Sequence, residues 1–334
     1  MDSLLCCYFP TKVIFVDDDE GVLKSINLFI NHDIANYDFF TNPHAALEVI
    51  NSSIPTDFIT ASISSPEAKI YELYKAMHNA KRHEEVSTVI VDFQMPAMNG
   101  LEFCEKIKNP YIRKILHTGV ADENIAVQAF NKGIIDGYIK KQDFNKEKIV
   151  NEFIHTSQLT YFKMLTDVLV GSVYKEINST NPEETAFYDP VFIQYFDELV
   201  KKHNICEYYL NETVGGFICL SRKGELSTLY AFTAATLEDN QINTYATLRD
   251  LIDLEAPSYA ALIKDIEEDR KTMCFPFYGE SCMDIDVDNW KNHIYSLDII
   301  EGNQPYYVVY VSHPGLEKKL NLYSFDQSQE ERGE

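Results

Sequence analysis

The sequence predicts an α/β domain with a doubly wound, five-stranded parallel sheet, followed by an α+β domain with an antiparallel sheet. From Lys12 to about His155, short apolar runs alternate with amphipathic stretches, a pattern typical of repeated β–α units. In the second half, strand candidates follow one another directly, and Arg222-Lys223-Gly224 is a hairpin turn signal between two of them. A length of 334 residues also favours two domains.

The first domain is predicted over residues 1–157. Its five strands correspond to apolar runs at 12–16, 37–40, 87–92, 112–118 and 136–140. Helix start and stop signals separate the runs, for example Asn99-Gly100 before one helix and Gly133 after another. Residues 51–85 interrupt the regular spacing with a Ser/Pro-rich loop and a helix. We interpret this insertion as packed decoration of the fold, with a partner surface as the alternative.

A connecting helix is predicted over residues 158–178, because helical periodicity continues without a break after the last helix of the first domain. The α+β domain is predicted over 179–323. Its expected helices lie at 190–202, 241–253 and 257–270, and its expected strands at 207–210, 215–220, 227–232, 271–275 and 305–313. Residues 324–334 are polar, and we expect them to be a disordered tail.

The net charge of the chain disfavours some classes of binding partner. Lys and Arg number 29 against 52 Asp and Glu, a net charge of -23, which repels phosphate backbones and anionic membranes. Nucleic-acid binding is therefore disfavoured.

Seven cysteines without metal-ligand spacing are typical of buried thiols in a reducing compartment. No apolar run approaches the roughly 18 residues of a membrane span, so we expect a cytoplasmic protein.

Acidic side chains follow two of the predicted strands. Asp17, Asp18 and Asp19 come directly after the first apolar run, and Asp92 follows the third. Carboxylates that meet at one edge of a parallel sheet repel one another unless a cation lies between them, and Mg²⁺ suits such oxygen ligands. Thr118 ends the fourth strand and Lys141 follows the fifth. This combination of groups suits phosphoryl transfer with Asp92 as the covalent nucleophile.

The segments VIFVDDDE, VIVDFQMPAMNGLEF, ILHTG and DGYIKK resemble the signature blocks of response-regulator receiver domains, over about residues 12–155. The resemblance implies a flavodoxin-like receiver of a two-component system. It implies that Asp17 and Asp18 hold Mg²⁺ together with Asp92 and the backbone carbonyl of Gln94. It also implies that Asp92 accepts a phosphoryl group from a sensor histidine kinase.

The same resemblance assigns the remaining positions of the pocket. Thr118 would hydrogen-bond the phosphoryl group, Lys141 would pair with one of its oxygens, and Tyr138 would be the switch aromatic that follows Thr118. The sequence departs from the family pattern at Gln142, where receivers have a proline after a cis peptide. We expect a trans peptide there, because a cis bond before a non-proline residue costs about 2.5–4 kcal/mol.

The second half resembles the output region of a group of proteobacterial response regulators that includes the quorum-sensing regulator of the Legionella Lqs system. Its matching segments include YYLNETVGGFICLSRKGE and EGNQPYYVVYV. This resemblance implies a non-standard output domain. No basic recognition helix is visible, and we expect an output that binds a downstream protein. The alternatives are an output that binds a nucleotide or small ligand, and one that binds DNA directly.

The sequence therefore predicts a regulator that dimerises when Asp92 is phosphorylated and that catalyses only its own phosphotransfer and dephosphorylation. The rival interpretation is a pseudo-receiver that no longer takes a phosphoryl group. The retained acidic residues, Thr118 and Lys141 argue against that rival.

Overall fold

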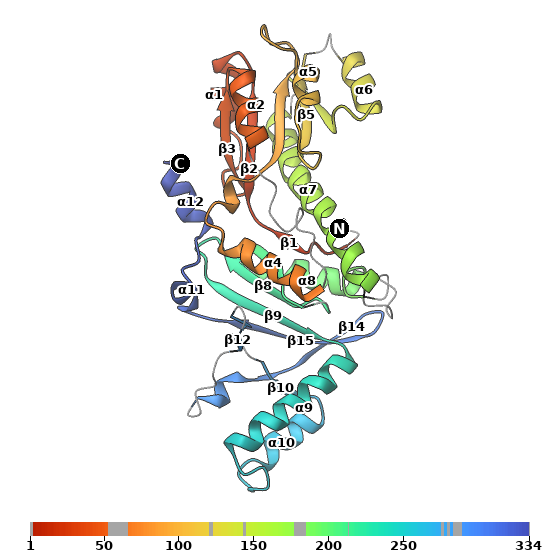
Figure 1. The fold of residues 1–334 in the computed structure, drawn as a ribbon, viewed down its shortest axis with the longest axis vertical. Helices are drawn as coiled ribbons and strands as arrows, with labels where there is room; N and C mark the ends of the chain where they lie inside the picture. Colours follow the sequence, from red (N-terminus) through yellow and green to blue (C-terminus); the bar gives the residue numbers. More distant parts are fainter. Residues whose placement is uncertain are drawn as a thin grey trace. The chain divides into compact units, whose positions relative to one another are not determined.

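The computed structural model describes residues 3–52, 66–119, 123–142, 145–176, 185–212, 214–274, 277–278, 281–282 and 289–333 (Figure 1). The chain forms two compact units. The N-terminal unit comprises Cys6–Ile63, Ala76–Gly171 and Phe325–Glu334. The C-terminal unit comprises Met1–Leu5, Ser64–Lys75 and Ser172–Ser324.

The N-terminal unit is built on a parallel sheet in the order β3-β2-β4-β5-β6. Its strands are β2 (Thr11–Val16), β3 (Ala35–Phe40), β4 (Val86–Asp92), β5 (Arg113–Thr118) and β6 (Gly137–Lys140). The predicted α/β class and the five predicted strands are confirmed. A short strand, β1 (Cys7–Tyr8), precedes them.

Helices separate the strands of this sheet. They are α1 (Glu20–Asn27), α2 (Pro43–Ser52), α5 (Gly100–Glu105), α6 (Glu123–Asn131) and α7 (Lys146–Glu176). Asp19 caps the first turn of α1, and Asn99 caps that of α5. Each strand offers apolar side chains to both faces of the sheet, as expected where helices cover both. Val89 packs in the core on one face and Ile90 in the core on the other.

The insertion before β4 contains α4 (Pro66–His78) and a short 3₁₀ helix, η1 (Arg82–Glu84). Residues 64–75 belong to the C-terminal unit, and the chain from Ala76 onward to the N-terminal unit. The Ser/Pro-rich loop predicted within this insertion lies outside the described residues.

Helix α7 is one uninterrupted helix of 31 residues, as the continuous periodicity predicts. Val150 and Ile154 pack in the core beneath β2. Further along, the Gln158 side chain accepts a hydrogen bond from the backbone N–H of Thr11 at 3.1 Å. Residues up to Gly171 belong to the N-terminal unit, so that unit includes much of the predicted connecting helix. The predicted boundary near residue 179 lies outside the described residues.

The C-terminal unit contains an antiparallel sheet with neighbouring strands β7-β8-β9-β15-β14, which confirms the predicted α+β class. These strands are β7 (Ile205–Leu210), β8 (Phe217–Ser221), β9 (Leu226–Phe232), β15 (Pro305–Ser312) and β14 (Asp298–Glu301). The helices of this unit beyond α4 include α8 (Pro190–Lys202), α9 (Ala234–Leu251), α10 (Ala260–Glu267) and α11 (Leu316–Lys319). Smaller pieces are β10 (Lys271–Met273), β11 (Phe277–Tyr278), β12 (Ser281–Cys282), η4 (Trp290–His293) and β13 (Ile294–Ser296).

The end of the chain corrects one prediction. The polar composition of residues 324–334 predicts a disordered tail, but Phe325–Arg332 form a helix, α12. This helix belongs to the N-terminal unit, and its Phe325, Ser328 and Gln329 are buried. Contacts with residues far away in the sequence stabilise it, and local composition does not register such contacts. In the described part of the chain, no helix is long and apolar enough to span a membrane.

Candidate functional site

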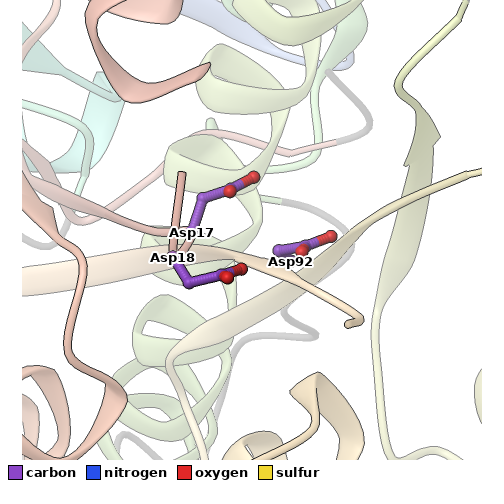
Figure 2. A group of neighbouring side chains, drawn as sticks. All are labelled: Asp17, Asp18 and Asp92. Atoms are coloured by element: carbon purple, nitrogen blue, oxygen red, sulfur yellow. The ribbon is translucent and has the colours of Figure 1, made fainter. Parts of the chain in front are cut away.

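Three carboxylates meet at the carboxyl end of the parallel sheet (Figure 2). Asp17 and Asp18 directly follow β2, and Asp92 is the last residue of β4, the strand paired with β2. One oxygen from each residue lies within 4.8 Å of the others, so the group could hold a metal ion. Asp17 and Asp92 are buried, whereas Asp18 is exposed. The sequence prediction that these residues come together is therefore met by the geometry.

The backbone around Asp17 fixes its direction. Its N–H donates to the carbonyl of Phe40 at the end of β3, at 3.1 Å, so the strand pairing continues as far as this residue. One oxygen of its carboxylate accepts the backbone N–H of Asp19 at 3.0 Å. Asp19 turns away from the cluster, because its side chain caps α1 by accepting the N–H of Gly21 at 2.8 Å.

Lys141 brings a positive charge to the cluster. Its Nζ lies 2.7 Å from Asp17 Oδ2 and 2.9 Å from Asp92 Oδ1. A hydrogen bond from its backbone N–H to the carbonyl of Thr118, at 2.9 Å, positions the residue just beyond β6. No peptide bond in the described part of the chain is cis, including the bond before Gln142. The trans peptide expected there leaves Lys141 able to reach both carboxylates.

Burial and the neighbouring charged groups both shift the pKa values of Asp92 and Lys141. Burial raises the pKa of Asp92, and the nearby Asp17 carboxylate adds to this, while hydrogen bonds from Lys141 and from the backbone of Gln94 lower it without cancelling the rise. Burial lowers the pKa of Lys141, but the hydrogen bonds and charges of Asp17 and Asp92 outweigh it and raise that pKa. The lysine therefore stays an ammonium, and it lies against Asp92 and Asp17 as a positive charge.

The other predicted residues lie on neighbouring strand ends. Thr118 ends β5 and is fully buried, and its hydroxyl is 3.3 Å from the carbonyl of Gly119. Tyr138 on β6 is half-buried and packs against the core that contains Leu116. Gln94 is exposed, and its backbone hydrogen-bonds the carboxylate of Asp92. The predicted metal contact through its carbonyl stays a prediction.

One residue that matters here was missed by sequence reasoning. Gly100 begins α5, and a Cβ at this position would come within 2.4 Å of the carbonyl oxygen of Asp92 and 2.9 Å of the Leu116 side chain. Only glycine lets the start of α5 pass so close to the end of β4. Its N–H also donates to the carbonyl of Phe93 at 3.0 Å, which closes the loop after Asp92. The Asn-Gly pair after the strand was the available signal, and it was interpreted only as a helix start.

In the C-terminal unit, several tyrosines pack the sheet. Tyr208, Tyr209 and Tyr306 are buried, and Trp290 packs in a separate core with Leu248. A hollow of about 360 Å³ lies where β7 and β9 begin and where β8 and β15 end. His203 and Tyr310 line it, with their ring centroids 4.2 Å apart.

Comparisons with known proteins agree with this geometry. Residues 67–153, which include Asp92, Thr118 and Lys141, match the response regulator receiver domain family. The structure of the Legionella pneumophila response regulator LqsR is similar over almost the whole chain, with 28% sequence identity and a TM-score of 0.73. That similarity covers 99% of this chain and 96% of LqsR, and so extends over both units.

A curated relative matches a little under half of the chain. The transcriptional regulatory protein FlgR of Helicobacter pylori (strain ATCC 700392 / 26695) is 26% identical over 152 residues, which are 46% of this chain and 31% of FlgR. The chain thus matches about a third of the length of this relative.

Proposed function

The chain is a response regulator with a receiver domain in its first half, and we propose that phosphorylation of Asp92 by a sensor histidine kinase controls it. The observation that carries this proposal is the position of Asp92 between two other carboxylates and the ammonium of Lys141. An acceptor aspartate needs positive charge on both sides of the incoming phosphoryl group. Lys141 supplies one such charge, and a cation held by Asp17 and Asp18 would supply the other.

The residues present fit Mg²⁺. Three ionised carboxylates beside one ammonium leave two negative charges uncompensated, and the oxygen donors are those that Mg²⁺ prefers. The ion, when bound by Asp17, Asp18, Asp92 and the carbonyl of Gln94, would neutralise charge on the phosphoryl oxygens. Asp18 is exposed, so this side of the cluster is open to solvent and to the phosphodonor.

In the proposed step, a carboxylate oxygen of Asp92 attacks the phosphorus of a phosphohistidine on the kinase. The new O–P bond forms as the P–N bond breaks, and the electron pair returns to the histidine nitrogen. Lys141 is already within 2.9 Å of Asp92 and would pair with an oxygen of the transferred group. Thr118 would turn its hydroxyl from Gly119 toward another oxygen, and Tyr138 would follow into the space that the hydroxyl leaves.

We further propose that phosphorylation drives formation of a homodimer through the face made by α6, β6 and α7. Phe130, Tyr138, Ile149 and Phe153 line a hollow of about 440 Å³ there. Ile125, Val127 and Phe130 on α6 are large apolar side chains left 41%, 39% and 51% exposed. Tyr138 belongs to both the hollow and the core behind Thr118, so its movement would reshape the surface that a second copy meets.

We propose that the C-terminal unit acts on a downstream protein. Residues 172–324, the main part of this unit, carry 12 basic and 25 acidic residues, a net charge of -13, which disfavours nucleic acid as the target. The hollow beside His203 and Tyr310 supports a second candidate, a small ligand, because its size is at the lower end of the range of ligand pockets. Stabilisation of the protein by nucleotides in a thermal-shift screen, lost in Tyr310→Ala, would favour that candidate.

The central proposal is tested with purified protein, Mg²⁺ and either acetyl phosphate or beryllofluoride. With acetyl phosphate, intact mass should show one added phosphoryl group; with either reagent, light scattering should show a dimer. Asp92→Asn should give neither, whereas Asp239→Asn, an exposed control on α9, should behave as wild type. An unmodified wild-type protein that stays monomeric in both reagents would instead support the pseudo-receiver.

A further inference from the structure

The last helix of the chain, α12, belongs to the N-terminal unit although it comes after the C-terminal unit in sequence. It lies beside β3, the edge strand of the receiver sheet (Figure 1). Its inward residues are Phe325, Ser328, Gln329 and Arg332, spaced three, four and seven residues from the first, so that one helix face makes the contacts.

The first half of this face is anchored by burial. The Phe325 ring is fully buried and lies edge-on to the ring of His83, with centroids 5.2 Å apart. The hydroxyl of Ser328 accepts a hydrogen bond from the Asn36 side chain at 2.9 Å, and the Gln329 amide donates to the carbonyl of His32. The two buried polar side chains of the helix, Ser328 and Gln329, each find a partner on the receiver, so the fit is specific.

The second half is held by a cluster of four charges. Arg332 pairs with Asp38 on β3 and with Glu84 on η1, the latter at 3.1 Å. Lys12 on β2 contacts the same two carboxylates and lies 2.9 Å from Asp38. The Arg332 guanidinium also donates to the backbone carbonyl of Tyr37 at 2.7 Å. A side chain of α12 thus satisfies a carbonyl on a strand edge that would otherwise be open to pairing.

The helix has little stability of its own. Its sequence, FDQSQEER, contains one apolar residue, and isolated helices shorter than about 12–15 residues are marginal in water. The charges that hold its end are partly exposed, at 19% for Arg332, 25% for Asp38 and 39% for Glu84, so salt screens them. Formation of the helix therefore depends on its docking.

We propose that α12 is an intramolecular latch: it folds only when docked on the receiver surface formed by His32, Asn36, Asp38, His83 and Glu84. That surface is a helix-binding site, which the chain fills with its own C-terminal segment. Docking ties the end of the chain back to the receiver, and release would free that end from the receiver surface. This inference does not depend on phosphorylation of Asp92.

The latch is tested on the full-length chain by hydrogen exchange. In wild type, the amides of 326–332 should be protected. Arg332→Ala and Phe325→Ala should each raise their exchange rates at least tenfold and also raise exchange at residues 36–38. Glu331→Ala, an exposed neighbour on the outward side of the helix, should leave exchange unchanged. Equal exchange of these amides in wild type and Arg332→Ala would overturn the proposal.

A labelled synthetic peptide of residues 320–334 gives a second readout. It should bind full-length Arg332→Ala at least tenfold more tightly than wild type, because the wild-type site is already filled. A peptide that itself carries Arg332→Ala should bind neither protein. Equal binding to both proteins, or to neither, would show that the surface is not a vacated helix site, and would leave the phosphorylation test of Asp92 unaffected.

Discussion

The ammonium of Lys141 lies 2.9 Å from the carboxylate of Asp92, although their strands are separated in the sheet by β5. The lysine side chain reaches across the end of β5 to do this, and in the same position it contacts Asp17, which directly follows β2. One flexible cation is thereby shared between a metal-binding candidate, Asp17, and the proposed phosphoryl acceptor, Asp92. A substitution of Lys141 should therefore change both Mg²⁺ binding and phosphorylation.

Replacing Lys141 by methionine should strengthen Mg²⁺ binding and slow phosphorylation. The substitution removes a positive charge that competes with the ion, and it also removes a partner for the phosphoryl oxygens, which costs about 10²-fold in rate for comparable donors. Calorimetry with Mg²⁺ and the rate of adduct formation with acetyl phosphate measure the two effects. Lys140→Met, which breaks a surface pair with Glu123 and leaves the carboxylate cluster intact, is the control. Weaker Mg²⁺ binding in Lys141→Met would contradict the shared-cation arrangement.

Asp18→Asn should lower Mg²⁺ affinity with little effect on folding, because Asp18 is exposed and serves the cluster only. The rise in the unfolding temperature on adding Mg²⁺ should shrink, and chelation of the metal should abolish phosphorylation in wild type. Asp19→Ser is a matched control, since serine keeps the cap on α1 and Asp19 is outside the cluster. An undiminished Mg²⁺ response in Asp18→Asn would remove this residue from the metal site.

Gly100→Ala should destabilise the receiver by about 1–3 kcal/mol, the usual cost of forcing atoms into a packed site. Its Cβ would press on the carbonyl of Asp92, which is backbone and has little room to move. Urea unfolding measures the change. Gly21→Ala is the comparison: its Cβ would approach only the Asp19 side chain, and alanine suits a helix better than glycine. Equal stability of the two variants would mean that the α5 start can shift away from the acceptor.

The stabilising effect of His313 should depend on pH. Burial, with a smaller effect of His293, lowers the pKa of His313 to about 4, and its Nε2 lies 3.1 Å from the Thr228 hydroxyl. Because the folded-state pKa lies below the ordinary 6.5, the stabilisation is complete above pH 6.5 and is lost as the pH falls toward 4. The gap in free energy of unfolding between wild type and His313→Gln should therefore shrink by roughly 2–3 kcal/mol between pH 7 and pH 4. A constant gap would show that His313 does not titrate on unfolding.

Phe130→Ser should prevent dimerisation in beryllofluoride while leaving phosphorylation of Asp92 intact. The side chain is half exposed on α6 and lines the hollow of the proposed interface, so its loss removes apolar contact without opening the core. Light scattering and intact mass separate the two effects. Val191→Ser, an exposed apolar residue on α8, should dimerise as wild type does. Normal dimerisation of Phe130→Ser would place the interface on another face.

The receiver sheet and its acidic edge could be predicted because their signals are local. Each strand is a short apolar run, and each functional residue follows a run directly, so parallel topology alone places Asp17 beside Asp92. The resemblance to receivers that these blocks predicted is confirmed by the comparisons. The role of Gly100 was harder to predict. It depends on the close approach of the α5 start to the backbone of Asp92, and the sequence pattern gives no sign of that contact.

The end of the chain could not be predicted for a different physical reason. Asn36 and Ser328 are separated by 292 residues, and Arg332 and Asp38 by 294. Local composition indicates whether a segment can fold alone, and here it indicated correctly that the segment lacks an apolar face. It carries no record of a surface elsewhere that supplies the missing partners. Strand β14 was missed for a related reason, since its four residues are defined by pairing with β15.

The length of α7 determines how far a small tilt at its receiver end displaces its other end. At about 1.5 Å per residue, its 31 residues span roughly 46 Å. A rigid rod of this length is a lever: a tilt of about 5° at the receiver moves the far end by about 4 Å. The helix is uninterrupted from Lys146 to Glu176, so a small tilt of its first turns beside β6 becomes a larger displacement of its last turn.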